Sequence, residues 1–521
     1  MKNKKIIIVD FGSQTCHLIG RRLRDMGVDI EIIDPEDAVL EVKKHKPAGI
    51  IFSGGPASVY GKDSPTINKK IFDLGIPILG ICYGWQITAK VLGGKVVLGN
   101  KEYGPGLITL KIKNEKLKIK NDNVRLEIFK NLPERSTVWL SHGDMVSKLP
   151  KGFEIVGSTK DVKAAFVASK KRNIFGVQFH PEVEHTVNGK QVLKNFIERI
   201  CLLKTKKREI SVKEIISNLK KEVGDKKVIC AVSGGVDSTV TAALLAKTIG
   251  KNLYPVYVES GLMRLGTKEE VIDIFKNNFK VKPVVIEAES IFLKKLKGVV
   301  DPEEKRKIIG RLYIELFEKQ AKRIKGVECL AQGTIYSDVI ESKGTKKASK
   351  IKSHHNVGGL PEKMGLKLVE PLRNYYKDEV RLIARKLGLP KEVWGKQVFP
   401  GPGQAIRIVG EVTPKRLAQQ QQADTIVLEE IQKANLYDKV YMSFPIMSGT
   451  KSTAVKGDAR SFFEVVAIRV IESQDVMTTN WSRLPYDVLQ KISSRVVNEV
   501  PDVSRVVYDI TTKPPATMEW E

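Results

Sequence analysis

Cysteine is scarce in this sequence, and the few cysteines form no pattern typical of metal or disulfide sites. Five occur in 521 residues, with no CxxC pair, at positions 16, 82, 201, 230 and 329. This spacing argues against a disulfide framework and structural zinc, and it favours a reducing compartment. The start, MKNKKIIIVDFG, has no small-residue cleavage site, so we expect no export signal and a cytoplasmic protein.

Long apolar runs are also missing. No stretch reaches the roughly 18 consecutive apolar residues that a membrane-spanning helix needs, so we expect no membrane partner. Acidic residues are outnumbered by basic ones, and the formal net charge is +28. Nucleic-acid binding is one interpretation of that charge. The lysines are scattered, however, so we favour a solvated basic surface that attracts small anionic substrates, with no nucleic acid as the main partner.

The length and the order of apolar segments predict three domains. Strand-like runs bounded by Gly or Pro alternate with helical patterns through the first 200 residues, and the alternation restarts after the basic segment KTKKRE at 204–209, which we interpret as a linker. Such alternation is typical of α/β domains with largely parallel sheets, and the last 120 or so residues are typical of a small α+β domain. The predicted domains are residues 1–202, 203–398 and 399–521.

Cys82 is the first candidate catalytic residue. In IPILGICYGWQITAK a strand-like run enters a Gly-flanked turn and then a helix, a position where the helix dipole favours a thiolate. A lone cysteine is more often a small buried apolar residue. The segment FGVQFHPEV adds His180 as a base, and Glu182, two residues on, shares its face if both lie on a strand. Together the three favour a nucleophile.

Three motifs around these residues resemble class I glutamine amidotransferases: SGGP at 53–56, GICYGWQ at 80–86 and FHPE at 179–182. That family hydrolyses glutamine through a cysteinyl thioester and releases ammonia. The resemblance implies that Cys82 is the nucleophile, His180 the base and Glu182 the group that orients it. It also implies oxyanion-hole amides at Gly55 and Tyr83 and glutamine contacts at Gln86 and near SHGD, 141–144.

The loop SGGVDS, 233–238, follows a predicted strand and opens a helix, which directs backbone N–H groups and the helix dipole at one anion. A Gly-rich turn with a polar cap is the alternative. The loop lacks the lysine of a Walker A motif and has Asp237 instead, which suits phosphates chiefly through Mg²⁺. It resembles the pyrophosphate-binding loop of ATP pyrophosphatases. The resemblance implies that ATP and Mg²⁺ bind through Ser233, Gly234, Gly235, Val236, Asp237 and Ser238.

Further segments resemble the GMP synthetase family over the whole chain: DPEEKRKIIGR at 301–311, IKSHHNVGGLPE at 351–362, FPGPG at 399–403 and KPPATMEWE at 513–521. Asparagine synthetase, NAD synthetase and tRNA-thiolation enzymes fit less well. Asparagine synthetase uses an N-terminal cysteine, whereas residue 2 here is Lys2. The glutaminase of NAD synthetase is of the nitrilase type, which GICYGWQ is not. Enzymes of tRNA thiolation often carry paired cysteines, and this sequence has none. The resemblance implies that ATP adenylates the C2 oxygen of XMP and that ammonia from glutamine displaces AMP, giving GMP for guanine nucleotide biosynthesis. It places XMP at Arg306, Lys513 and Glu519, a lid lysine at Lys352, and a homodimer contact in the C-terminal domain.

Some positions depart from that family's pattern. Glu259 stands at a usual aspartate, Ser337 at a usual proline and Gln404 at a usual leucine, while KQV before FPGPG lacks the usual arginine and proline. We expect these to affect nucleotide affinity more than the reaction. There are two alternative functions. The net charge suggests a nucleic-acid-binding protein that retains a pyrophosphatase fold. A catalytically dead, regulatory amidotransferase is disfavoured, because Cys82, His180 and Glu182 are all present.

Overall fold

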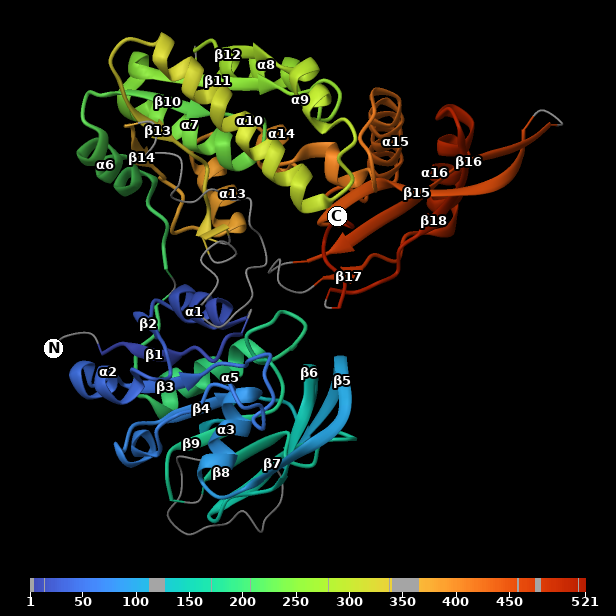
Figure 1. Cartoon of the computed structure of the whole chain (residues 1–521). Helices are drawn as coiled ribbons and strands as arrows, with labels where there is room; N and C mark the ends of the chain where they lie inside the picture. Colours follow the sequence, from blue (N-terminus) through green and yellow to red (C-terminus); the bar gives the residue numbers. More distant parts are fainter. Residues whose placement is uncertain are drawn as a thin grey trace. The chain divides into compact units, whose positions relative to one another are not determined.

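The structure is a computed structural model that describes residues 4–111, 127–336, 338–339, 365–473 and 479–521, apart from positions 14, 170, 207, 280, 457–458 and 514 (Figure 1). The chain divides into two compact units, one ending at Glu209 and the other beginning at Ile210. The predicted boundaries at 202 and 398 stay predictions.

The first unit is built on a nine-stranded sheet. Its parallel part has the order β2-β1-β3-β4-β9, and the strands are Ile30–Ile33, Ile6–Val9, Gly49–Phe52, Ile78–Ile81 and Ile174–Val177. Along β1, Ile6 and Ile8 pack in one core with α1 (Cys16–Asp25) and α5 (Gly189–Asn195). Ile7 and Val9 pack in a second core with α2 (Ala38–His45) and α3 (Tyr83–Val91). The alternation of side chains along the strand therefore places helices on both faces.

Four antiparallel strands extend this sheet in the order β8-β7-β5-β6, and they are Phe166–Ser169, Phe153–Ser158, Lys95–Leu110 and Arg135–Lys148. The long β5–β6 pair brings β6 beside α3. The α/β alternation in the sequence does not predict this antiparallel part.

The second unit contains a five-stranded parallel sheet in the order β12-β11-β10-β13-β14. On β10, Val228 and Cys230 face a core shared with α6, α7, α8 and α13, while Ile229 faces α10 on the other side. The strands are Val284–Glu287, Leu253–Glu259, Lys227–Ala231, Val327–Ala331 and Lys367–Val369, and the helices are α6 Val212–Val223, α7 Val236–Ile249, α8 Thr267–Phe279, α10 Pro302–Arg323 and α13 Lys377–Lys386.

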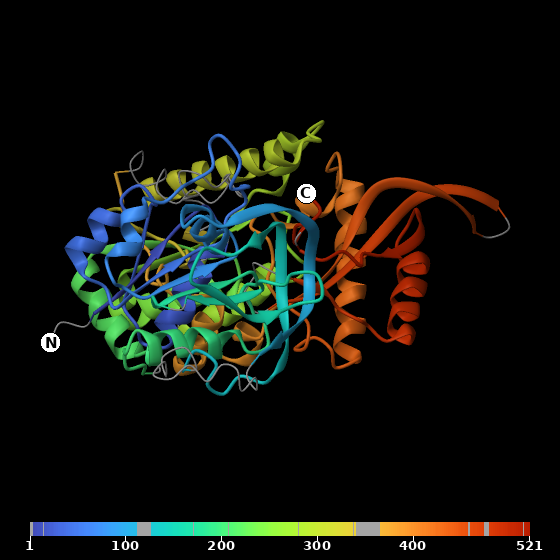
Figure 2. The same ribbon diagram turned by 90° about the horizontal axis from the view of Figure 1, so that it is seen from below.

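A smaller sheet follows in the same unit. β15 (Met442–Lys456) and β16 (Ala459–Glu472) form a long antiparallel hairpin, β17 (Asn480–Trp481) adds to it, and β18 (Val503–Tyr508) pairs in parallel with β16. The helices α15 (Pro414–Lys433) and α16 (Tyr486–Glu499) lie beside it, and the hairpin projects past both (Figure 2). The predicted fold class, two largely parallel α/β sheets with a smaller α+β part, is confirmed.

The basic segment interpreted as a linker is partly bound to the first unit. Lys206 N donates to Met26 O at 2.8 Å, and a Cβ on Gly27 would lie 2.2 Å from Lys206 O. Gly27, with a φ of 73°, therefore permits this close approach. No helix in the described part of the chain is long and apolar enough to span a membrane.

Candidate active sites

Cys82 stands at a sharp turn between β4 and α3. Its φ of 49° and ψ of −107° are unusual for a residue with a side chain. The turn is tight because a Cβ on Gly84 would lie 2.5 Å from Phe52 O, so only glycine lets α3 pack this closely on β3. The elbow that the sequence predicts is therefore present, with Cys82 immediately before the helix N-terminus.

His180 and Glu182 approach Cys82 from the segment after β9. His180 Nδ1 lies 2.8 Å from Glu182 Oε1. A Cβ on Gly54 would lie 3.1 Å from His180 Cε1 and 3.8 Å from Cys82 Cβ. Both side chains therefore lie next to Gly54. The prediction that a shared strand face aligns the pair is wrong, because β9 ends at Val177. A turn after the strand brings the two side chains together instead.

The electrostatics of this cluster favour a protonated histidine. Burial alone would lower the pKa of His180, but the adjacent Glu182 carboxylate and the neighbouring Cys82 raise it well above its ordinary value. Glu182 is 0% exposed, so its charge is little screened. His142 on β6 behaves oppositely: burial, and secondarily the charge of His180, lower its pKa to about 4. The cluster therefore places a positively charged proton donor beside Cys82.

The other predicted glutaminase positions lie around the same cysteine. Tyr83 is the first residue of α3, where a backbone N–H has no intrahelical acceptor. Gly55 packs so closely that a Cβ would lie 2.7 Å from Phe11 O and 3.3 Å from Tyr83 Cγ. Gln86 Nε2 donates to Asp144 O at 2.7 Å, and Ser141 O lies 3.7 Å from Cys82 Sγ. The segment 141–144 therefore runs past both Cys82 and Gln86.

The loop 233–238 lies between β10 and α7, as the sequence predicts. Gly234 has a φ of 77°, and Ser233 N donates to Ser238 Oγ at 3.1 Å. Val236 and Asp237 occupy the first turn of α7, where N–H groups have no intrahelical acceptors. The loop therefore offers backbone donors and a helix N-terminus to an anion.

Two lysines that the sequence did not single out contact this loop. Lys377 Nζ donates to Asp237 Oδ2 at 2.6 Å, and Lys396 Nζ donates to Gly234 O at 2.9 Å. Lys396 also pairs with Glu270 on α8 at 2.6 Å. Walker A loops carry a lysine of their own, whereas here distant segments supply the cations. Lys377 is followed by Asp and Glu in an ordinary helix start, so the sequence holds no signal for this role.

A cavity of about 1370 Å³ joins the loop to the C-terminal end of the chain. Arg306, Lys513 and Glu519 all line it, together with the loop residues. Arg306 also contacts Glu303 and the backbone oxygen of the last residue, Glu521. Lys352, the predicted lid lysine, lies outside the described residues.

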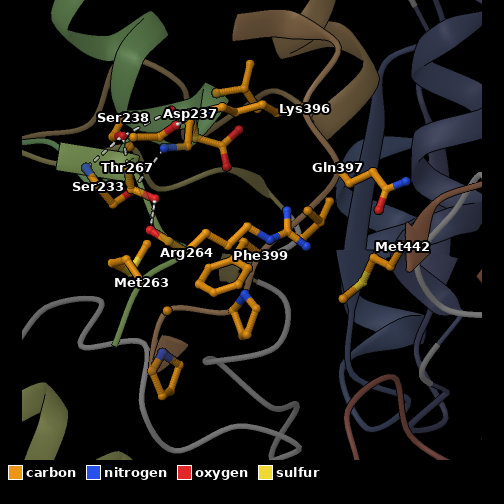
Figure 3. A pocket seen from close by; sticks show the side chains of 18 of the residues that line it. Ser233, Asp237, Ser238, Met263, Arg264, Thr267, Lys396, Gln397, Phe399 and Met442 are labelled. Atoms are coloured by element: carbon orange, nitrogen blue, oxygen red, sulfur yellow. Dashed lines mark hydrogen bonds between the residues drawn. The ribbon is translucent and has the colours of Figure 1, made fainter. Parts of the chain in front are cut away.

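Arginines and one phenylalanine support the wall of this cavity. Figure 3 shows Arg264 extending across the face of Phe399, with its Cζ 4.9 Å from the ring centroid. The fully buried Arg407 lies 4.8 Å from the same centroid and donates to both oxygens of Glu519 at 3.1 Å. Asp424 on α15 pairs with Arg264 at 2.7 Å and with Arg407 at 3.6 Å. The carboxylate of Glu519 is thus held in place by a buried cation.

Comparison with known proteins identifies the chain. Residues 7–200 match the family "Glutamine amidotransferase class-I", and residues 429–520 match "GMP synthase C terminal domain". The "GMP synthase [glutamine-hydrolyzing]" of Aquifex aeolicus is 49% identical over 524 residues, and that of Campylobacter lari is 48% identical over 523 residues; each match covers 100% of both chains. The chain belongs to the glutamine-hydrolysing GMP synthase family.

A likeness to solved structures was also found for part of the chain. A glutamine amidotransferase from Thermotoga maritima is 20% identical with a TM-score of 0.30, and the match covers 39% of this chain and 99% of that one.

Of the positions that depart from the family pattern, the KQV segment at 396–398 lines the cavity, whereas Gln404 and Glu259 do not. Gln404 is 0% exposed, and its Oε1 accepts from Gln420 Nε2 at 3.0 Å. Glu259 Oε1 accepts from Gly261 N at 3.0 Å. Neither residue lines the cavity, and Ser337 lies outside the described residues.

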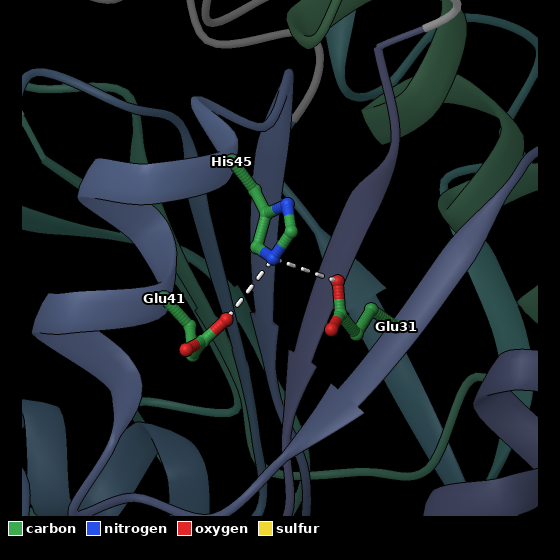
Figure 4. A group of neighbouring side chains, drawn as sticks. All are labelled: Glu31, Glu41 and His45. Carbon is green, nitrogen blue, oxygen red and sulfur yellow. Dashed lines mark hydrogen bonds and ion pairs between the residues drawn. The ribbon is translucent and has the colours of Figure 1, made fainter.

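Among the described residues, one group of His and Glu side chains in the first unit lies close enough together to hold a metal ion. His45 Nε2 is 3.0 Å from Glu41 Oε2 and 3.6 Å from Glu31 Oε2 (Figure 4). Lys44 and Lys5 neutralise these carboxylates at 3.1 and 2.6 Å. The group is therefore an ion-pair network without the net negative charge that would hold a cation.

Proposed function

We propose that the chain makes GMP from XMP, ATP and glutamine, with two reaction centres on one polypeptide. The observation that carries this proposal is the full-length match to glutamine-hydrolysing GMP synthases in a chain where the Cys82 cluster and the 233–238 loop are both complete. The first centre releases ammonia, and the second activates XMP and accepts that ammonia.

Glutamine hydrolysis begins with attack of the Cys82 thiolate on the carboxamide carbon. The resulting oxyanion accepts hydrogen bonds from the N–H groups of Gly55 and Tyr83, which stabilise charge as it develops. The His180 imidazolium donates its proton to the leaving nitrogen, so ammonia departs and a thioester remains. Neutral His180 then takes a proton from water, which cleaves the thioester to glutamate and restores the thiolate.

Synthesis of GMP follows in the second centre. The C2 oxygen of XMP attacks the α-phosphorus of ATP, and pyrophosphate leaves into the loop 233–238, where N–H groups face the phosphates. Ammonia then attacks C2 of the adenylated base, and AMP departs with the C2 oxygen. The cations Lys377 and Lys396 beside the loop stabilise the negative charge of the departing pyrophosphate.

Asp237 suits Mg²⁺ in this centre. Its Oδ1 is buried and has no hydrogen-bond partner within the described part of the chain, while its Oδ2 contacts Lys377. A carboxylate oxygen facing phosphates is a preferred magnesium ligand. When bound, Mg²⁺ would neutralise phosphate charge and favour pyrophosphate departure.

Arg306, Lys513 and Glu519 form the proposed XMP site. The two cations suit the dianionic phosphate of XMP. The Glu519 carboxylate, oriented by Arg407, suits the N–H donors of the xanthine ring. Their common position on the cavity that contains the ATP loop supports this assignment.

We further propose a cytoplasmic homodimer formed through the C-terminal domain, with Lys352 in a lid. Exposed apolar side chains on the β15–β16 hairpin, Val455 and Phe462, support an interface there, since they are 71% and 63% exposed. Sedimentation of the wild type and of Phe462→Asp tests the dimer: we expect a dimer and a shift toward monomer, and a monomeric wild type would contradict the proposal.

An isotope experiment tests the reaction itself. With XMP, ATP, Mg²⁺ and glutamine labelled with ¹⁵N in the amide, we expect labelled GMP and equal amounts of AMP and pyrophosphate. Formation of ADP instead, or unlabelled GMP in the presence of unlabelled ammonium, would contradict the proposed chemistry.

A further inference from the structure

The helix α1 begins with a threonine whose side chain does not cap it. Thr15 occupies the N-cap position, where a threonine hydroxyl commonly accepts a hydrogen bond from the first turn, yet no side-chain cap bond forms. The hydroxyl instead donates to Glu182 Oε1 at 2.6 Å, across 167 residues of sequence. The position of Thr15 at the start of α1 therefore places its hydroxyl against the Glu182 carboxylate, which contacts His180.

In the described part of the chain, two side chains form hydrogen bonds with that carboxylate. Its Oε1 accepts from both Thr15 and His180 Nδ1, and its Oε2 is buried with no hydrogen-bond partner among the residues described. The Arg22 side chain donates to the backbone oxygen of Glu182, at 2.8 Å, and leaves the carboxylate to Thr15 and His180. Because Glu182 is 0% exposed, bulk water cannot readily replace a lost donor.

The segment that carries Thr15 also contacts residues 53–55, the loop that contains the proposed oxyanion-hole residue Gly55. Ser13 Oγ lies 2.9 Å from Thr15 Oγ1, and a Cβ on Gly54 would lie 3.3 Å from Ser13 Oγ. Phe11 N donates to Ser53 Oγ at 2.9 Å. One turn after β1 thus contacts both the 53–55 loop and the carboxylate.

We propose that Thr15 is a positioning residue for glutamine hydrolysis, because its hydroxyl fixes the Glu182 carboxylate that orients His180. This inference rests on the proposed function of Cys82, His180 and Glu182. The helix dipole at the start of α1 adds to the effect, since it favours a carboxylate beside the first turn.

The role predicts a specific change in pH dependence. His180 is faced by Glu182 on its own segment, by Cys82 at the start of α3 and by His142 on β6. Cys16, beside Thr15, is fully buried. Without the Thr15 donor the carboxylate turns away from the imidazole, and the alkaline limb of kcat/KM for glutamine, which reports loss of the His180 proton, moves to lower pH.

Thr15→Val tests the inference because it removes the hydroxyl and keeps the shape. In the full chain we expect kcat for glutamine hydrolysis to fall about ten- to hundred-fold, the size of one hydrogen bond to a charged group, with KM for glutamine little changed. GMP synthesis from ammonium should remain at the wild-type rate, and Thr15→Ser should restore both the rate and the pH profile. The matched control is Thr159→Val, which removes a hydroxyl that accepts from Val162 N at 3.0 Å in the same unit.

Three outcomes would overturn the inference. They are an unchanged kcat and pH profile in Thr15→Val, an equal loss in Thr159→Val, and an equal loss of the ammonium reaction, which would indicate a general folding defect. Cys82→Ala separates this inference from the proposed function: if that variant keeps glutamine hydrolysis, the assignment of the centre fails and not merely that of Thr15.

Discussion

Lys377 Nζ lies 2.6 Å from Asp237 Oδ2, so the carboxylate proposed for Mg²⁺ is paired with a lysine at the start of α13. If ATP binds the 233–238 loop as proposed, its phosphate oxygens compete for this lysine. We infer that with ATP bound Lys377 would pair with phosphate, and the Asp237 carboxylate would then be available to hold Mg²⁺.

Asp237→Asn tests that exchange. The amide keeps the shape but loses the charge, so we expect GMP synthesis from ammonium to fall about a hundred-fold or more, with a higher Mg²⁺ concentration at half-maximal rate. Glutamine hydrolysis measured without nucleotides should not change. An unaltered Mg²⁺ dependence would contradict the assignment of Asp237.

Lys396→Met should weaken ATP binding. Lys396 holds Gly234 O at 2.9 Å while pairing with Glu270, so its loss frees the backbone of the loop. We expect KM for ATP to rise about ten-fold, as for loss of one charge-assisted hydrogen bond. Lys220→Met, which breaks an exposed pair with Asp225 outside the cavity, is the matched control and should have no effect. Equal KM values for ATP in the two variants would exclude a role for Lys396 in ATP binding.

Glu519→Gln should affect both XMP affinity and stability. The change removes the charge opposite Arg407, which is 0% exposed, and we expect a loss of about 1–3 kcal/mol in the free energy of unfolding of this unit. KM for XMP should rise while KM for ATP stays within two-fold or so of the wild type. Denaturant unfolding and initial rates measure the two effects, and an unchanged KM for XMP would remove Glu519 from the site.

Glu182→Gln should move the pH profile of glutamine hydrolysis. The carboxylate raises the pKa of His180, so its loss should shift the alkaline limb of kcat/KM to lower pH. The raised pKa also adds stability that is complete below the pKa of an unfolded histidine, about 6.5, and is lost as pH rises through the folded value. Unfolding of wild type and variant at pH 5 and pH 9 checks the sign: the difference in stability should be larger at pH 5.

Much of the fold was predictable because strand periodicity and Gly-bounded loops are local signals. The elbow at Cys82 and the strand–loop–helix at 233–238 are examples. The antiparallel β5–β6 pair was missed because Lys95–Leu110 mixes glycine, charge and proline without clear alternation. The strand-face argument for His180 and Glu182 failed because the strand ends three residues before the histidine, at Val177.

The contacts that the sequence did not predict join residues far apart along the chain. Thr15 meets Glu182 across 167 residues, and Lys377 and Lys396 meet the loop across 140 and 162. The run of four glutamines at 419–422 shows the same limit. The side chains donate to three different regions: Pro445 O, Gly261 O, and the end of α16 at Glu499 O and Pro501 O. No local pattern distinguishes these residues from surface polar ones, since the fold alone brings their partners near.

The most direct test of two centres on one chain is the rate of GMP formation from XMP, ATP and Mg²⁺, measured in parallel with glutamine and with ammonium, for the wild type and Cys82→Ala. Cys82→Ala should lose the glutamine reaction and keep the ammonium reaction at the wild-type rate. Equal loss of both reactions, or an unaffected glutamine reaction, would contradict the assignment of Cys82 as the nucleophile of a separate glutaminase centre.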